Sequence, residues 1–366
     1  MTEFTASDRA HMARALALAE RGLYTTTPNP RVGAVIVKDG VVIGEGWHER
    51  AGDAHAEVNA IADARARGSE PRGATMYVTL EPCNHAGRTP ACTDAVQAAG
   101  IARVVAAMRD PNPSAAHGSE RLAAAGIAVD VGLCEAEARE LNPGFVSVQT
   151  RGRPWVRLKV AASLDGRTAL SDGQSRWITG EAARADGHRF RARACAVMTG
   201  IGTVLTDDPE LTVRAVETPR QPRRIIVDRK AETPATAKVL RGEGALMITA
   251  GARNAGWPPS IESLALPDAQ GRVDLAAMLR ELARRDVNEL HVEAGAGLNG
   301  ALFAAGLVDE LLLYVAPDVI GDPARGIADF PGGLRTLGDR VAFALADVTR
   351  IGEDLRIIAR MAKGNP

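Results

Sequence analysis

The sequence predicts two α/β domains joined by a short linker. Its 366 residues exceed the ~250–300 at which a single hydrophobic core normally stops growing. Short runs rich in Val and Ile alternate along the chain with helical segments, which is the pattern of layered α/β domains. The stretch Arg151-Gly152-Arg153-Pro154 has the composition of a linker. We therefore expect one domain over residues 1–150 and another over 151–366.

Composition and charge narrow the class of protein. No apolar run approaches the ~20 residues needed to cross a bilayer, and residues 1–4 lack the basic region of a secretory signal. Four cysteines in so long a chain are no disulfide scaffold, so we expect a reducing cytoplasmic location and no membrane partner. The formal net charge is −1, without the basic bias of most nucleic-acid-binding proteins.

The elements of the first domain alternate between strand and helix. Helical periodicity over 8–22 is followed by a predicted hairpin, with strands at 33–38 and 41–47 around Asp39-Gly40. A helix opens at Asp53 or Ala54 and runs to about Arg67, which places His55 in its first turn. The remaining expected elements are a strand at 74–79, a helix at 92–100, a strand at 101–108 and a short helix at 134–144. This order predicts a layered domain with a mainly parallel sheet.

The chemistry of the first domain centres on His55-Ala56-Glu57, Pro82-Cys83 and Cys92. One imidazole and two thiols can hold a zinc ion, and three ligands leave a fourth position open, as catalytic zinc sites do. His-x-Glu followed by Pro-Cys and a second Cys is the signature of zinc deaminases, in which the Glu carries protons. The second Cys usually follows three residues after the first, whereas Cys92 follows Cys83 by nine, so a longer loop must fold back.

Other interpretations of these residues remain open. A lone His-x-Glu is common on protein surfaces, and a non-catalytic zinc module would need a fourth protein ligand, for which His85 is the nearby candidate. A nucleoside-type or tRNA-type deaminase fused to an unrelated domain would call for basic stripes and stacking aromatic residues, but only 4% of the chain is aromatic. Cys134 and Cys195 are interpreted as small buried hydrophobic residues without a role.

The second domain begins with a strand at 155–163, where apolar residues alternate with Arg157 and Lys159 as in a half-buried strand. Thr179 is predicted to cap a basic helix, and a strand at 195–200 leads into a loop containing Gly200, Gly202 and Thr203. Further strands are expected at 223–228, 245–250 and 287–294. The last leads to a glycine-rich loop at 295–300 and a helix at 301–310.

This glycine-rich loop has the GxGxxG pattern of dinucleotide-binding sites, and Asp318 lies about twenty residues on, as in a Rossmann fingerprint. A Rossmann domain would present that turn first, with several βα units after it, whereas here only one strand and a tail follow. We therefore interpret residues 295–300 as a phosphate-binding loop at a helix N-terminus without Rossmann topology.

Residues 1–150 resemble the cytidine-deaminase superfamily. The stretches TPNPRVGAVIV, GWHERAGDAHAEV, TLEPCNHAGRTPAC and RDPNP resemble the deaminase half of the bacterial bifunctional riboflavin-biosynthesis protein. That family deaminates a diamino-hydroxy-phosphoribosylamino-pyrimidine and then reduces its ribose. The resemblance implies a three-layer deaminase domain. It also implies zinc ligands His55, Cys83 and Cys92, the proton carrier Glu57, and pyrimidine contacts from Asn29, His48 and His85.

Residues 155–350 resemble the reductase half of the same family, which is dihydrofolate-reductase-like and uses NADPH. The matching stretches include KVAASLDGRTAL, SRWITG, GIGTVLTDDPELTVR, RIIVD and VEAGAGLNGALFAAGLVDELLLYVAP. The resemblance implies cofactor contacts at Ala161, Trp177, Thr203, Asp207, Gly295, Ala296, Gly297, Leu298, Asn299 and Gly300. It implies contacts to a small phosphoribosyl substrate from Ser175, Arg191, Leu211, Arg214 and Glu293.

Three further expectations concern the second domain. Arg191 and Arg214 offer forked donors suited to a ribose phosphate, although solvated surface charge is an equal alternative for either. Arg229, with Lys230, follows the strand at 223–228, where a cation could bind the 2′-phosphate of NADPH. The proton donor is left open between Asp207 and Glu293. We also expect a homo-oligomer, with a dimer favoured, because the apolar strand VDELLLYVAP could serve as an interface.

Overall fold

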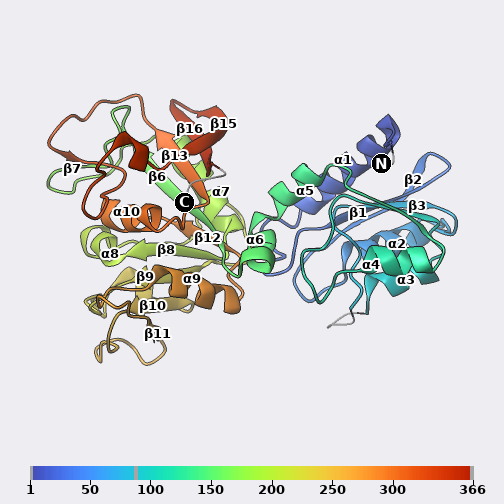
Figure 1. Ribbon diagram of the computed structural model, residues 1–366, viewed down its shortest axis with the longest axis horizontal. Coiled ribbons are helices and arrows are strands. Elements are labelled where there is room, and N and C mark those ends of the chain that lie inside the picture. The colour runs from blue at the N-terminus through green and yellow to red at the C-terminus, as the bar shows by residue number, and fades with distance from the viewer. Residues whose placement is uncertain (1–2, 86–89, 363–366) are drawn as a thin grey trace. The chain divides into compact units, whose positions relative to one another are not determined.

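The computed structural model describes residues 3–85 and 90–362 and divides into two compact units, Met1–Gly152 and Arg153–Pro366 (Figure 1). Each unit has its own sheet and its own hydrophobic core. No helix among the described residues has both the length and the apolar character needed to span a membrane.

The first unit is built on a mixed five-stranded sheet in the order β2-β1-β3-β4-β5. The strands are β1 (Gly33–Lys38), β2 (Val41–Trp47), β3 (Thr75–Val78), β4 (Arg103–Ala106) and β5 (Ala128–Val131). The predicted hairpin is confirmed: β1 and β2 are antiparallel, and Asp39 and Gly40 between them both have positive φ. β1 is also antiparallel to β3, so the expected parallel arrangement holds only from β3 to β5.

Helices cover both faces of this sheet and produce the predicted three layers (Figure 1). α1 (Ala6–Glu20) packs so closely on β1 that a Cβ at Gly33 would lie 2.0 Å from its backbone. α2 (Ala56–Ala66) packs on β2, where a Cβ at Gly46 would lie 2.4 Å from the helix backbone. Successive residues of a strand point to opposite faces, and Gly46 pairs with Ala34, the neighbour of Gly33. The two helices therefore lie on opposite faces of the sheet.

Several predictions for the first unit need correction. His55 is the N-cap of α2 and precedes its first turn, because the helix begins at Ala56. α4 (Gly118–Ala124) and β5 were not predicted. α6 (Pro143–Arg151), which directly follows α5 (Glu135–Leu141), was not predicted either. Pro143 occupies the start of α6, where a missing backbone N–H costs no helical hydrogen bond.

The second unit contains a nine-stranded sheet in the order β11-β10-β9-β8-β12-β6-β13-β16-β15. The strands from β11 to β13 run parallel, and β16 and β15 add an antiparallel hairpin at one edge. This order differs from that of a Rossmann fold, as expected. The bounds are β6 Trp155–Ala162, β8 Ala196–Gly200, β9 Arg223–Val227, β10 Ala245–Thr249, β11 Glu262–Ala265, β12 Glu289–Val292, β13 Glu310–Val315, β15 Phe343–Ile351 and β16 Asp354–Met361.

The two faces of this sheet are covered differently. On one face, α9 (Leu275–Arg284) and α10 (Ala296–Ala304) form the main apolar core with alternate residues of the central strands. On the other face, α7 (Glu181–Arg193) packs on β13, and the segment carrying Trp257 packs on β8 to β10. The short helix α8 (Ile201–Asp207) and the ribbon of β7 (Ala169–Leu170) with β14 (Ala324–Arg325) complete the described part of the unit.

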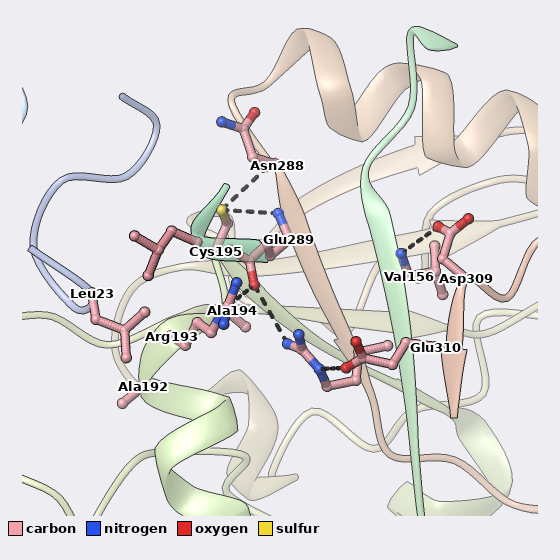
Figure 2. Close-up of polar contacts among 12 residues, drawn as sticks. Leu23, Val156, Ala192, Arg193, Ala194, Cys195, Asn288, Glu289, Asp309 and Glu310 are labelled. Carbon is pink, nitrogen blue, oxygen red and sulfur yellow. Dashed lines mark hydrogen bonds and ion pairs between the residues drawn. The ribbon is translucent and has the colours of Figure 1, made fainter. Parts of the chain in front are cut away.

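A layer of paired charges lies on the α7 side of the sheet. Arg157 of β6, with its side chain only 3% exposed, forms ion pairs with Glu310 of β13 and Glu289 of β12. Arg193, at the end of α7, donates to Glu289 at 2.7 Å. Figure 2 shows Arg193 and Glu289 close to Cys195. The Cys195 thiol is buried and accepts backbone N–H groups of Asn288 and Glu289. The prediction of a half-buried β6 is therefore wrong, because α7 covers its charged face.

Four predicted boundaries in the second unit also change. α10 begins at Ala296 with Gly295 as N-cap, so most of the glycine pattern lies inside the helix, and 310–315 is strand rather than helix. Residues 201–207 form α8 and not a loop, and α7 is capped by Gly180 rather than by Thr179. β13 hydrogen-bonds to β6 on one side and to β16 on the other, so its edges cannot form the dimer contact that its apolar sequence suggested.

Candidate functional sites

Two helix starts and one loop bring the three candidate metal ligands together. His55 is the N-cap of α2, Cys92 begins α3 (Cys92–Ala98), and Cys83 lies in the loop after β3. The ligand atoms of these residues all lie within 4.8 Å of one another. His55 Nδ1 is 3.2 Å from Cys92 Sγ and 3.6 Å from Cys83 Sγ. The backbone N–H of Cys92 donates to Cys83 Sγ at 3.4 Å, which holds the long loop against the start of α3.

The donor set fits a zinc ion. The hydrogen bond from the Cys92 thiol, together with His55, lowers the pKa of Cys83 to about 4, and the pKa of Cys92 is raised in turn because the proton stays on it. A ready thiolate beside an imidazole and a second thiol is a zinc-binding set, and three protein ligands leave the fourth position open. Across residues 3–85 and 90–362 this is the one group of His, Cys, Asp or Glu that could hold a metal ion.

Glu57 lies beside these ligands without belonging to them. It occupies the first turn of α2 and is 3% exposed. Burial, aided by the charge of Cys83, raises its pKa to about 7. A carboxyl group in this state can both accept and release a proton near neutral pH, which is what a general acid–base residue requires.

Asn29 and His48 form a pair next to His55. His48 Nδ1 donates to the carbonyl of Ala54 at 3.1 Å, so its Nε2 accepts from the Asn29 amide at 3.0 Å. The rings of His48 and His55 meet edge to face, with centroids 5.2 Å apart. His48 is 2% exposed, and burial lowers its pKa, so it is a neutral residue that orients Asn29. His85 is exposed and directly precedes residues 86–89, which lie outside the described part of the chain.

A cavity of about 1490 Å³ lies in the second unit, between α7, α8 and the start of α10. It gathers almost all the residues predicted for cofactor and substrate. Those in its lining are Ala161, Ser175, Trp177, Arg191, Thr203, Asp207, Leu211, Arg214, Glu293, Gly295, Ala296, Gly297, Leu298 and Asn299.

Two predicted cofactor residues lie outside this lining. Gly300 faces the backbone of Asp329, where a Cβ would lie 1.8 Å from the carbonyl oxygen, so this glycine permits close packing of α10. Arg229 donates through Nε to the carbonyl of Gly271 at 2.8 Å, away from the residues that line the cavity. Asp318, the Rossmann alternative, is also absent from the lining.

The cavity contains an ion pair between Arg191 and Glu293. Arg191 forms a two-pronged ion pair with Glu293, one contact of which is 2.8 Å, and donates to the Thr212 carbonyl at 3.0 Å. These contacts hold the pKa of the buried Glu293 well below its usual range, although burial alone would raise it. Lys159 also lines the cavity, and burial lowers its pKa.

Sequence reasoning missed several charged or polar residues of this cavity, among them Lys159, Arg184 and His188. Lys159 was assigned to the solvent side of its strand, but α7 covers that side. Arg184 and His188 lie on α7 at the helical spacing that puts them on the same side as Arg191, a signal that could have been used. The Arg184 guanidinium lies 4.5 Å from the centroid of the Trp177 ring.

Comparisons with known proteins match both units. Residues 5–108 match the family model "Cytidine and deoxycytidylate deaminase zinc-binding region", and residues 154–357 match "RibD C-terminal domain". The chain is 46% identical to the riboflavin biosynthesis protein RibD of Escherichia coli (strain K12), covering 95% of this chain and 98% of that protein. It is 43% identical to RibD of Haemophilus influenzae, with 98% of both chains covered.

Solved structures agree. Acinetobacter baumannii RibD, form 1, superposes with a TM-score of 0.90 at 42% identity, covering 98% of this chain and 99% of that one. A Thermotoga maritima protein superposes with a TM-score of 0.89 at 36% identity, covering 97% and 99%. Near-complete coverage in both directions, together with the zinc-binding donor set and the cavity, shows that the chain belongs to the RibD family of bifunctional riboflavin-biosynthesis enzymes, which unite a zinc-dependent deaminase with an NADPH-dependent reductase.

Proposed function

We propose that residues 1–150 deaminate a diamino-hydroxy-phosphoribosylamino-pyrimidine and that residues 151–366 reduce the ribosyl chain of the resulting 5-amino-6-(5-phosphoribosylamino)uracil. The Thermotoga maritima relative is described as a diaminohydroxyphosphoribosylaminopyrimidine deaminase and 5-amino-6-(5-phosphoribosylamino)uracil reductase. The observation that carries the proposal is the close approach of His55, Cys83 and Cys92, with Glu57 buried beside them in the same unit.

In the first site, His55, Cys83 and Cys92 would hold the zinc ion. Bound there, zinc lowers the pKa of water and so supplies hydroxide near neutral pH. Glu57 would accept one proton from the attacking water and pass it to the ring nitrogen, and would then carry the proton of the new hydroxyl group to the amino group, which leaves as ammonia. Asn29, fixed through its amide by His48, offers its carbonyl oxygen to a donor on the pyrimidine. His85 is assigned to the same substrate by resemblance.

In the second site, Trp177, Thr203, Asp207 and the first turn of α10 would contact NADPH. The first four N–H groups of a helix lack intrahelical partners, so the start of α10 suits the cofactor's phosphates. NADPH would supply the hydride for C1′ of the ring-opened imine, whose C=N bond becomes a single bond as its nitrogen takes up a proton. The chain contributes orientation: the Arg191–Glu293 pair fixes a carboxylate toward the sugar, and Arg214 lies at the same wall.

The proton for the reduction is assigned to Lys159. Lys159 lines the cavity, Glu293 and Arg191 are the charges that act on it, and burial lowers its pKa, so it releases a proton more readily than an exposed lysine. Glu293 is unsuited to donate because Arg191 holds it ionised. Asp207 belongs to the cofactor side of the proposal, and its backbone carbonyl accepts from Arg176 at 2.7 Å.

The remaining parts of the proposal concern partners and location. We propose a cytoplasmic homodimer that acts on small phosphorylated substrates and binds no nucleic acid. Leu345 and Val348 are exposed on the edge strand β15, which offers an apolar surface for a second copy. Arg229 is proposed to contact the 2′-phosphate of NADPH, which requires its hydrogen bond to the Gly271 carbonyl to break when the cofactor binds.

Both activities are tested on the full chain loaded with zinc. With the pyrimidine substrate, ammonia should be released first, and NADPH should be oxidised only after the deaminated product forms. Supplying the deaminated product directly should give NADPH oxidation without ammonia. Oxidation of NADPH with the untreated pyrimidine and no ammonia release would contradict the proposed order of the two sites. Light scattering after size-exclusion chromatography measures the oligomeric state.

A further inference from the structure

His188 of α7 has no role in the assignments above, yet its side chain lines the wall of the reductase cavity. The adjacent Gly187 lines the same wall, and a Cβ placed on it would meet nothing within 4 Å. A glycine in a helix interior costs about 1 kcal/mol relative to alanine, so this position gives up helix stability and leaves open space beside the imidazole.

The hydrogen bonding of His188 fixes which ring nitrogen carries its proton. The backbone N–H of Arg214 donates to Nδ1 at 3.2 Å, so Nδ1 is the acceptor and the proton of the neutral ring is on Nε2. No partner for Nε2 is found among the described residues. The imidazole therefore presents one free N–H donor at the cavity wall.

The surroundings of His188 keep it neutral. Burial, aided by Arg191 of its own helix, Arg214 of the segment after α8 and Lys159 of β6, lowers its pKa to about 4, while Glu293 beyond β12 acts in the opposite direction. His188 can therefore donate a hydrogen bond at neutral pH but adds no charge.

The same corner has an excess of positive charge. Arg191 has committed three of its N–H groups to Glu293 and Thr212, and Arg214 pairs with Glu210 at 2.9 Å. Lys159 is the third cation near His188. Three cations against two carboxylates leave a site that favours an anionic ligand, and a phosphate needs several donors around its oxygens.

We propose that His188 is a specificity-determining residue whose Nε2–H donates to the phosphate of the phosphoribosyl substrate during the reduction. This inference rests on the proposed function of the second unit. Arg214 supplies charge at the phosphate, Arg191 holds Glu293 toward the sugar, and His188 supplies a directed neutral donor. The open space beside Gly187 receives the ligand at this point.

Three substitutions in the full-length chain test the hydrogen bond. His188→Gln places an amide nitrogen near the position of Nε2, His188→Asn reaches only to the position of Nδ1, and His188→Ala removes both. The reductase KM is measured for 5-amino-6-(5-phosphoribosylamino)uracil and for its dephosphorylated counterpart. We expect KM for the phosphorylated substrate to rise at least about tenfold in the Ala and Asn variants and to stay within about threefold in the Gln variant. KM for NADPH should not change.

The dephosphorylated substrate separates a phosphate contact from a general defect. For it, all three variants should match the wild type; an equal rise for both substrates would overturn the inference. Arg189→Ala, on the exposed side of the same helix turn, is the matched control. If the Ala variant is unstable, the difference between Gln and Asn decides, and equal KM values for these two would also overturn the proposal. An inactive wild type would instead remove the proposed function itself.

A spectroscopic measurement is independent of turnover. In a two-bond ¹H–¹⁵N spectrum of the imidazoles, the signals missing from His188→Gln identify His188. We expect the Nε2–H tautomer at pH 7 and a shift of these signals when inorganic phosphate is added. A protonated ring, an Nδ1–H tautomer or no response to phosphate would contradict the inference.

Discussion

The two sites of this chain are built on opposite plans. In the first unit, three ligand atoms within 4.8 Å of one another come from residues at most 37 positions apart, and the proton carrier is two residues from a ligand. In the second unit, a cavity of about 1490 Å³ is lined by residues from Lys159 to Asp329. The first site is compact and made of few groups, whereas the second is wide and made of many.

This difference has consequences for how each site fails. Every group in the compact site has a separate chemical task, so losing one should abolish the reaction without disturbing the fold. In the second unit, the charged residues of the cavity lie on the α7 side of the sheet. The buried ion pairs of Arg157 with Glu289 and Glu310 lie on that same side. Activity and stability should therefore be coupled in the second unit and separable in the first.

The largest expected effect is that of Glu57→Gln. Because Glu57 carries the proton but does not bind zinc, deamination should fall by about 10²–10⁴ while zinc content and reduction of the deaminated substrate are unchanged. Metal analysis and ammonia release measure the two quantities. Glu49→Gln, an exposed neighbour outside the site, serves as the control. Loss of zinc in Glu57→Gln would show that the carboxylate supports the metal and that zinc binding and proton transfer are not separable in this site.

The next largest effect is on stability in the second unit. Arg157→Met removes a buried partner of Glu310 and Glu289, and breaking a buried ion pair on one side destabilises a protein by about 3–5 kcal/mol. Denaturant unfolding should show the second unit lowered and the first unaffected, with reductase activity lost and deaminase activity kept. Arg189→Met is the exposed control. An unchanged unfolding midpoint would mean that Arg193 and Arg360 alone neutralise the two carboxylates.

Much of the compact site could be predicted because its information is local. The hairpin at Asp39-Gly40 and the metal motif depend on residues close in sequence, and the structure brings the three ligands together. The start of α2 was misplaced because Asp53, a typical N-cap residue, lies two residues before the actual N-cap His55, which makes no side-chain cap hydrogen bond.

The second unit was harder to predict because its burial pattern depends on distant segments. Arg157 and Lys159 alternate with apolar residues, which normally indicates a solvent-facing side, and only packing of α7 reveals that this side is buried. The glycines at 295–300 were interpreted as a phosphate-binding loop because of their GxGxxG pattern, but α10 begins at Ala296 and Gly300 is needed where Asp329 crosses it. Arg229 followed a strand as predicted, yet nothing in the sequence indicates its bond to Gly271.

A smaller effect should change the stability and the activity of the second unit together, in opposite directions. Gly187→Ala removes a helix-interior glycine and adds a methyl group where nothing lies within 4 Å, so the second unit should gain about 1 kcal/mol of stability. The same methyl group enters the space assigned to the substrate, so the reductase KM should rise. Thermal unfolding and NADPH oxidation measure both changes, and the deaminase activity is the internal reference. A stabilised variant with unchanged reduction would show that the ligand does not approach this turn.

The pH dependence of stability should reveal the charge state of His188. The pKa of His188 is about 4 in the folded chain and about 6.5 when unfolded, because burial with Arg191, Arg214 and Lys159 outweighs Glu293. The unfolded chain therefore takes up the proton first, and the stability contributed by neutral His188 is present above pH 6.5 and lost as the pH falls toward 4.

His188→Gln lacks this loss. The unfolding midpoint of the second unit is measured for both proteins, and the value for the wild type minus that for the variant should decrease as the pH is lowered from 7.5 to 5. Effects of acid on other groups are common to both proteins and cancel. A difference that rises as the pH falls would mean that the folded protein favours the charged imidazole, and the neutral-donor account of the cavity would be wrong.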